Sequence, residues 1–536
     1  MVLSLLPTAA LAEDGEDVAE INGTKYATLD EAVSKAQDEQ TIKLLNDAST
    51  DTLKAGLTYD LAGHTLTYTG KKPFSYADRT TSFIDTSVSG TNRGGIISAP
   101  NIQSVQASIN VQSGATLNLN NITFRTPGSA FFPQGDAAAV NIENCDVYAG
   151  VYCLGTNAAT TDNYNVVISL SNSNFYATAS DNDNCPIYIN VTGTLNIDNC
   201  NVVGGRQGLM VRAGTANITN SDIKTTGGYS NREQYYTSNW GSGNELPAAA
   251  LIVGNYNAGA ATAYFNNATV TLTNTKLTGE NNFPALYVDG NATYKGTVTI
   301  SGDNSVISGT VMKGQNPLAA EISISSGAFS DLNSAIAYAA DGAIIKLAAD
   351  TTEDVVIPAG KNITLDLNGH KIVDSATPQN SSVAVASRKH TITNNGTLTI
   401  IDSVGTGVVD NISHGKAAVY NNGTLTIAGG TITRSVDVAP KFSSDPETNS
   451  WYVMYNAKGA TMTIDGGEII GNSTYSSCVC NLGNATVSGG TIRQDEMIAF
   501  KNDDTGTLTV TGGTIISKDQ AIQNWKDATI TGGDIE

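Results

Sequence analysis

The sequence predicts an all-β protein built as a right-handed parallel β-helix, a solenoid of short stacked coils. Three observations predict it: a strand–turn–strand pattern that recurs at short steps, an Asn at one fixed place in each copy, and a composition rich in Thr, Asn, Gly and Val. The pattern is clearest at residues 193–202, GTLNIDNCNV. Repeats of about 20–50 residues are typical of solenoids, in which each copy buries its apolar face against its neighbours.

The first half of the chain carries further copies of this pattern. Aligning them stacks one apolar column and, two residues later, one Asn column. Asn tolerates left-handed backbone, and its amide can bond the same amide on the next coil, so we expect a ladder at a turn. The apolar column is Leu119, Ile142, Leu170, Ile197, Ile218 and Leu272, and the Asn column is Asn121, Asn144, Asn172, Asn199, Asn220 and Asn274.

The second half repeats the form GTLTIxGGTI and changes its turn chemistry. A Gly column replaces the Asn column, and we expect it to supply positive φ. A second Asn column lies at the end of the preceding strand. We interpret this half as a stalk or spacer whose repeats continue past Glu536. The Gly column is Gly429, Gly466, Gly489, Gly512 and Gly532, and the second Asn column is Asn421, Asn456, Asn481, Asn502 and Asn524.

A duplicated unit predicts two β-helices in tandem, each preceded by a capping helix. Residues 28–37 have helical spacing of apolar side chains and begin with a capping box, Thr28 and Glu31. The same parts recur at residues 329–370, and DLAGH, ending at His64, returns as DLNGH, ending at His370. A short amphipathic helix can cover the open end of a solenoid. We expect a first β-helix at 13–315 and a second at 316–536, with both histidines in structural turns.

The termini and the charge indicate where the protein acts. Residues 1–12, MVLSLLPTAALA, resemble the end of a secretory signal peptide, so we expect a secreted or bacterial cell-surface protein. The net charge of −21 disfavours nucleic acid and anionic membranes as partners. No membrane insertion is expected. We expect a monomer whose partner is a polysaccharide or a host or cell-surface glycan.

Six cysteines leave two interpretations open for an exported chain. Cys145 and Cys200 share a ladder position, but two coils of about 4.8 Å separate them, beyond the usual bridging distance. We favour buried thiols over disulfides. We expect no metal site and no cofactor, although the acidic excess leaves weak Ca²⁺ binding open.

A candidate ligand-binding region combines an insertion with one strand face. Between Ile223 and Ala268 the chain is about twice as long as a coil requires, and the excess includes a loop at 227–246. Long insertions on solenoids often carry binding groups. In the strand before each rung, one alternating set is apolar and the other points outward. The loop supplies Tyr229, Arg232, Glu233, Tyr235, Tyr236, Trp240, Asn244 and Glu245, and the outward face supplies Tyr152, Tyr188, Asn190, Arg206, Arg212, Tyr287 and Asp289.

The coil pattern and its Asn ladder resemble the pectate-lyase-like family of right-handed β-helices. The chain also looks like the large secreted surface proteins of gut bacteria that carry such helices as adhesive modules. The resemblance covers roughly residues 90–536 and implies architecture more than activity.

Three functions fit the predicted groove. Aromatic faces pack on sugar rings while Arg, Asn and Asp bond their substituents, so a non-catalytic glycan-binding adhesin ranks first. The alternative is a carbohydrate-active enzyme, either a polysaccharide lyase or a glycoside hydrolase, using Arg206, Arg212, Glu233, Glu245 and Asp289. A purely structural spacer ranks third, with the tyrosines and Trp240 packing the loop onto the coils. The acidic groups that the family's lyases and hydrolases present on adjacent coils are not evident here.

Overall fold

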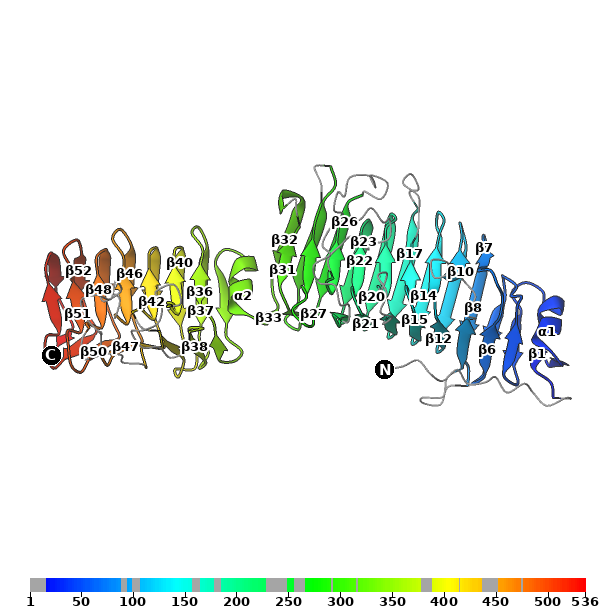
Figure 1. Cartoon of the computed structure of the whole chain (residues 1–536), viewed down its shortest axis with the longest axis horizontal. Helices are drawn as coiled ribbons and strands as arrows, with labels where there is room; N and C mark the ends of the chain where they lie inside the picture. The colour runs from blue at the N-terminus through cyan, green and yellow to red at the C-terminus, as the bar shows by residue number, and fades with distance from the viewer. Residues whose placement is uncertain are drawn as a thin grey trace. The chain divides into compact units, whose positions relative to one another are not determined.

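The computed structural model shows two units of stacked parallel β-strands (Figure 1). It describes residues 16–87, 94–98, 107–156, 164–177, 185–227, 248–254, 266–290, 293–314, 317–376, 388–413, 415–435, 452–473 and 476–536. The predicted parallel β-helix is confirmed, since nearly every described strand pairs in parallel with a strand one coil away. The expected signal peptide at 1–12 lies outside the described residues. No helix in the described ranges is long and apolar enough to span a membrane.

Three sheets form the first unit, and each complete coil contributes one strand to each sheet. Here they are named A, B and C in chain order. Sheet A contains β2 (Thr24–Tyr26), β1 (Ala19–Ile21), β3 (Thr41–Leu44), β5 (Thr58–Asp60), β8 (Thr80–Ile84), β11 (Thr116–Asn120), β14 (Ala139–Glu143), β17 (Val166–Ser171), β20 (Gly193–Asp198), β23 (Gly214–Thr219), β26 (Ala268–Thr273), β29 (Gly296–Ser301) and β32 (Ala320–Ile324). Sheet B contains β4 (Ala48–Thr50), β6 (Thr65–Tyr68), β9 (Gly95–Ser98), β12 (Thr123–Thr126), β15 (Asp146–Ala149), β18 (Asn174–Ala177), β21 (Asn201–Gly204), β24 (Asp222–Thr225), β27 (Lys276–Gly279), β30 (Val306–Ser308) and β33 (Ala328–Phe329). Sheet C contains β7 (Phe74–Tyr76), β10 (Ala107–Val111), β13 (Ser129–Pro133), β16 (Leu154–Gly155), β19 (Ile187–Ile189), β22 (Leu209–Val211), β25 (Leu251–Val253), β28 (Leu286–Val288) and β31 (Val311–Lys313).

The second unit has the same three-sheet plan, with sheets D, E and F in chain order. Sheet D contains β34 (Ala343–Lys346), β37 (Asn362–Asp366), β40 (Thr397–Ile401), β43 (Thr424–Ile427), β46 (Thr461–Ile464), β49 (Asn484–Val487), β52 (Thr507–Val510) and β55 (Asp527–Ile530). Sheet E contains β35 (Thr351–Thr352), β38 (Lys371–Val373), β41 (Val408–Asp410), β44 (Thr431–Thr433), β47 (Glu468–Gly471), β50 (Thr491–Gln494), β53 (Thr514–Ser517) and β56 (Asp534–Ile535). Sheet F contains β36 (Val355–Ile357), β39 (Ile392–Asn394), β42 (Val419–Asn421), β45 (Met454–Asn456), β48 (Val479–Asn481), β51 (Phe500–Asn502) and β54 (Ile522–Asn524).

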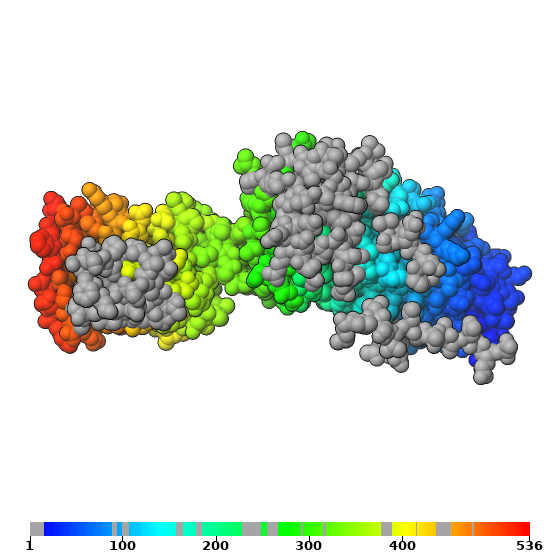
Figure 2. Space-filling view, in the orientation of Figure 1, coloured from blue at the N-terminus to red at the C-terminus, as the bar shows by residue number. Residues whose placement is uncertain are grey.

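The division between the units follows the strand pairing. The first unit runs to Ser330, and the second begins at Asp331. The boundary expected from the sequence, 315/316, would assign β32 and β33 to the second unit. In the structure they pair with β29 and β30 of the first unit. Within each unit the coils follow one another in chain order, so the colour changes coil by coil in the space-filling view (Figure 2).

The first-unit columns form as the sequence predicts. Leu119 pairs with Ile142, and the same register continues through the later copies, with all six apolar side chains buried. The six Asn residues that follow have φ between 49° and 60°, in the left-handed region. Asn199 Nδ2 donates to Asn172 Oδ1 at 2.7 Å, and Asn144 donates to Asn121. Asn220 departs from this pattern, since its Nδ2 donates to Asp198 Oδ1 at 3.0 Å. Amide hydrogen bonds between side chains therefore link neighbouring coils at part of the turn between sheets A and B.

The second unit buries its Asn ladder instead of exposing it. Asn421 Nδ2 donates to Asn456 Oδ1 at 2.7 Å, Asn456 to Asn481 at 2.7 Å, and Asn481 to Asn502 at 2.8 Å. These four side chains are fully buried. Each amide also donates to a backbone carbonyl on the following coil, so a continuous chain of hydrogen bonds runs along the inner edge of sheet F.

The predicted source of positive φ in the second unit is wrong by one residue. The second glycine of each pair has positive φ, namely Gly430, Gly467, Gly490, Gly513 and Gly533, with φ between 70° and 89°. The first glycines, from Gly429 to Gly532, meet the backbone of the preceding coil where a Cβ would sit. Left-handed backbone therefore selects the second glycine, and close approach between coils selects the first.

The predicted capping helix is present near the start of each unit, where in the first unit it follows the antiparallel strands β1 and β2. In α1 (Leu29–Lys35), the N-cap Thr28 Oγ1 accepts from Glu31 N at 3.2 Å. In α2 (Leu332–Tyr338), the N-cap Asp331 accepts from Ser334 N at 2.7 Å. Lys361 Nζ donates to Ala339 O at 2.8 Å at the end of α2, and Lys54 does the same for Ala36 in α1. A cation at a helix C-terminus complements its dipole.

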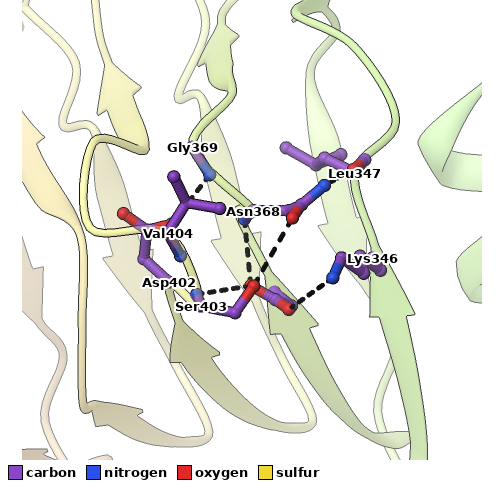
Figure 3. Close-up of polar contacts among 8 residues, drawn as sticks. Lys346, Leu347, Asn368, Gly369, Asp402, Ser403 and Val404 are labelled. Atoms are coloured by element: carbon purple, nitrogen blue, oxygen red, sulfur yellow. Dashed lines mark hydrogen bonds and ion pairs between the residues drawn. The ribbon is translucent and has the colours of Figure 1, made fainter.

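The DLAGH and DLNGH motifs form turns that carboxylates hold closed. Asp366 accepts from Asn368 N and Ser403 N, both at 2.9 Å, and Asp402 accepts from Gly369 N at 2.8 Å (Figure 3). In the first unit, Asp60 and Asp85 take the corresponding roles. His64 and His370 end these turns beside Asp47 and Asp350.

All six cysteines are free and buried, as expected for structural thiols. Burial raises the pKa of Cys200 to about 11 and that of Cys480 to about 12. Protonated buried thiols are poor nucleophiles, which removes them from the candidates for chemistry.

We predict that Asn456→Ala lowers the free energy of unfolding of the full chain by about 2–3 kcal/mol, because it interrupts the buried ladder and leaves neighbouring amides without partners. Urea denaturation followed by circular dichroism measures it. Asn422→Ala, one residue after the ladder position at Asn421 and exposed, is the control and is expected to change stability by less than about 0.5 kcal/mol. Equal effects of the two substitutions would contradict the ladder's role.

We also predict an acid-dependent contribution from Asp402. Burial alone raises the pKa of this carboxyl, but hydrogen bonds from Gly407 N and Gly369 N outweigh it and lower the pKa below 3.8. A lowered folded pKa means that the carboxylate stabilises the fold above the unfolded pKa of about 4 and loses this effect as pH falls through the folded value.

Asp402→Asn is therefore expected to lower the melting temperature at pH 7, at a cost of about 1–3 kcal/mol, and this difference from the parent is expected to shrink below about pH 4. Thermal melts between neutral and acid pH measure the effect, with exposed Asp504→Asn as the control. A difference that stays constant over the whole pH range would count against this assignment.

Candidate ligand-binding face

The outward face of sheet C carries a row of large side chains. In β19, β22, β25 and β28 the middle residues are Tyr188, Met210, Ile252 and Tyr287, and they pair with one another in register. Successive side chains of a strand point to opposite faces, so the residues on either side point into the core and this row points outward. The row is the one that the sequence predicts from β19 onward.

These outward side chains are nevertheless buried, with exposed fractions between 0 and 3 %. They form a hydrophobic cluster of their own with Ala107, Phe132, Val151, Tyr152, Cys185 and Ala249. The outward row of sheet A is different, since Asn141, Asn196 and Asn217 are polar and exposed. The outward row of sheet C is therefore apolar and buried, unlike that of sheet A.

Polar groups accompany this row and bond to its tyrosines. Arg212 Nη1 donates to the Tyr188 hydroxyl at 3.2 Å. The Tyr287 hydroxyl donates to Asp289 Oδ2 at 2.8 Å, and Gly290 N donates to Asp289 Oδ1 at 2.8 Å. Arg212 is 5 % exposed and Asp289 is 1 % exposed. The structure thus brings the predicted residues Tyr188, Arg212, Tyr287 and Asp289 onto one face, and all four are buried.

The predicted place of Tyr152 in the outward row needs a correction. In the structure Leu154 pairs with Ile187, and Gly155, three residues after Tyr152, lies opposite Tyr188. Tyr152 precedes β16, yet its ring stacks on that of Tyr188 with centroids 5.6 Å apart. With only two residues, β16 has no alternating pattern that could fix its register in the sequence.

Arg206 lies at the corner between sheets B and C, between β21 and β22. It is 4 % exposed, and its carbonyl accepts from Thr225 Oγ1 at 2.7 Å. The predicted loop residues Tyr229, Arg232, Glu233, Tyr235, Tyr236, Trp240, Asn244 and Glu245 all lie outside the described residues.

The longest connections of both units border the third sheet. In the first unit, residues 228–247 join β24 to β25, and residues 255–265 join β25 to β26. In the second unit, residues 377–387 and 436–451 each join a strand of sheet E to the next strand of sheet F. Insertions into a solenoid gather at its binding face, so both units single out the same face.

The outward face of sheet F carries an aromatic column that was not predicted from the sequence. The Tyr420 ring lies 4.8 Å from the His390 ring and 5.3 Å from the Tyr455 ring, and the two tyrosine rings are parallel within 4°. Burial lowers the pKa of His390 to about 4, so it is neutral at pH 7. The signal lay in the Asn column, because Tyr420 and Tyr455 each directly precede a ladder Asn and are therefore one coil apart.

The residues that could ligate a metal are dispersed. In the described ranges, no three or more His, Cys, Asp or Glu side chains group so that they could hold a metal ion.

The fold and this covered face define the chain as a two-unit parallel β-helix protein. No family model matches it, and neither a curated protein nor a solved structure was found to resemble it. Its function must therefore be argued from the face itself.

We predict that Tyr287→Phe lowers the free energy of unfolding by about 1–2 kcal/mol, because it removes the hydrogen bond to the buried Asp289 carboxylate. Thermal or urea denaturation of the full chain measures it. Tyr148→Phe, on the outward face of sheet B and only half-buried, is the control and is expected to be close to neutral. A neutral Tyr287→Phe would show that the hydroxyl adds nothing to this face.

Proposed function

We propose that this protein is a non-catalytic glycan-binding module of a secreted or cell-surface bacterial protein, with its ligand site on the outward face of sheet C. The proposal keeps the adhesive role implied by the resemblance to pectate-lyase-like β-helices and to the surface proteins of gut bacteria. The observation that carries it is the pairing of Tyr188 with Arg212 and of Tyr287 with Asp289 on one outward face. Aromatic rings beside such donors and acceptors suit sugar recognition.

Two further features support this face over the others. It alone among the outward faces of the first unit carries a row of buried tyrosine and aliphatic side chains over four successive described strands, β19 to β28. The longest connections of the unit also border it.

The enzyme alternative has less support from the described residues. The positions that follow the four strands are Asn190, Arg212, Gly254 and Asp289, so they supply one carboxylate. A glycoside hydrolase uses a pair of carboxyl groups on either side of the bond that it breaks. Asp289 is already held by Tyr287 and Gly290, as expected for a group that shapes a site.

A glycan-array screen of the full chain, run beside assays for new reducing ends and for unsaturated products, tests the proposal. We expect saturable binding without products. Products from any bound polysaccharide would favour the enzyme, and absence of binding to every glycan would contradict the proposed function.

We predict that Arg212→Ala weakens binding to the recognised glycan by at least about tenfold, since a buried, hydrogen-bonded arginine is typical of the residues that dominate binding energy. Titration calorimetry measures the affinity. Arg125→Ala is the matched control, because Arg125 lies over the Tyr148 ring at 4.0 Å on the outward face of sheet B. Equal losses of glycan affinity in the two variants would contradict a binding site on sheet C.

A further inference from the structure

Asparagine is followed directly by glycine at four places in the chain, and such pairs are open to a spontaneous reaction. The backbone nitrogen of the glycine can attack the side-chain carbonyl of the asparagine and displace its amide. Glycine favours this attack because it adds no Cβ that would crowd the approach. The four asparagines are Asn22, Asn368, Asn395 and Asn422, and all four lie in the described ranges.

The attacking nitrogen is already held at the pair Asn368–Gly369. Gly369 N donates to the Asp402 carboxylate at 2.8 Å. The attack requires this N–H to leave the carboxylate, to lose its proton and to turn toward the preceding side chain. Hydrogen bonds to charged groups are among the stronger ones in proteins, so this bond slows the reaction at Asn368.

The buried Asn ladder of the second unit holds two further glycines. Gly396 N donates to Asn394 Oδ1 and Gly423 N donates to Asn421 Oδ1, both at 3.2 Å. Asn394 and Asn421 are fully buried, so these acceptors are fixed in place. The ladder that stacks the coils therefore also restrains the nitrogen that would attack the asparagine just before each glycine.

The pair Asn22–Gly23 differs from the other three. It forms the two-residue turn between β1 and β2, with Ile21 paired to Thr24. Both turn residues have positive φ, 49° at Asn22 and 80° at Gly23, as in a type I′ hairpin. Both are exposed, and within the described ranges no hydrogen bond holds the Gly23 N–H. The space beside Gly23 is open, since a Cβ there would meet no atom within 4 Å.

We infer that Asn22 is the site at which this protein deamidates. Gly23 N loses its proton and bonds to Asn22 Cγ, the Cγ–Nδ2 bond breaks, and the amide group takes up a proton and leaves as ammonia. Water then opens the cyclic imide. Cleavage of the new bond to Cγ leaves aspartate at position 22, and cleavage of the bond to the main-chain carbonyl carbon leaves isoaspartate. This inference does not depend on the proposed function.

The isoaspartate form changes the end of sheet A, because it lengthens the backbone of the turn by one carbon. Among the described strands, β2 pairs only with β1, and the bond from Val18 N to Tyr26 O, at 2.8 Å, closes the other end of the hairpin. A longer turn cannot keep Ile21 opposite Thr24 in type I′ geometry. β2 is therefore expected to loosen and to expose the edge of β1, where another chain could pair.

Incubation of the full chain in mildly alkaline buffer, followed by peptide mapping with mass spectrometry, tests the inference. Asn22 is expected to deamidate about tenfold or more faster than Asn368, Asn395 or Asn422, since breaking a hydrogen bond adds to the barrier for the attack. Similar rates at Asn22 and another of these sites, faster loss at another site, or no deamidation at Asn22 would overturn the inference.

Asn22→Gly is the matched control for the structural effect, because a Gly–Gly turn keeps positive φ and has no side-chain amide to lose. After incubation, amide hydrogen exchange at residues 18–26 is expected to become faster in the parent and to stay unchanged in Asn22→Gly. Unchanged exchange in a parent that has formed isoaspartate at position 22 would contradict the loosening of β2.

Asp402→Ala tests the reason why Asn22 stands apart, because it removes the acceptor that holds Gly369 N. In the folded variant, Asn368 is expected to deamidate about tenfold faster than in the parent. An unchanged rate at Asn368 would overturn the protective role of the hydrogen bond. If the variant does not fold, the comparison of the four sites in the parent decides the inference.

Discussion

The structure depends on one constraint, that every coil must place its backbone on the previous coil at a spacing of about 4.8 Å. Strands meet this constraint through the hydrogen bonds between their backbones, but turns have no such ladder. The two units therefore hold their turns at this spacing by different means. The first unit stacks exposed left-handed Asn residues between sheets A and B, where Asn199 bonds Asn172. The second unit buries its Asn chain beside sheet F and turns on paired glycines.

The residues that recur at the same place in every coil could be predicted from the sequence. Features that differ from one coil or one residue to the next could not. The apolar column from Leu119 to Leu272 and both Asn columns were predictable, because each coil must present the same residue at the same place. The glycine with positive φ was assigned one residue early, because either glycine of a pair fits the sequence, and only the backbone separates left-handed geometry at Gly467 from close approach at Gly466.

The candidate site shows the same limit. Strand alternation predicted that Tyr188 and Tyr287 point outward, and both do. It could not predict that they are buried, because periodicity distinguishes the two faces of a strand and says nothing of what covers them. The aromatic column at Tyr420 and Tyr455 was not predicted, because the regularity of the second-unit repeats favours a spacer and does not single out one outward position. In both units the aromatic side chains that were not fully predicted lie on the outward face of the third sheet, sheet C or sheet F.

Amide hydrogen exchange of the full chain, with and without a glycan found to bind, tests the location of the site most directly. The account predicts slower exchange on binding at residues 186–190, 208–212 and 285–290, which form neighbouring strands of sheet C and their ends. It predicts no change along the outward face of sheet A. Protection confined to sheet A or to the second unit would contradict the account.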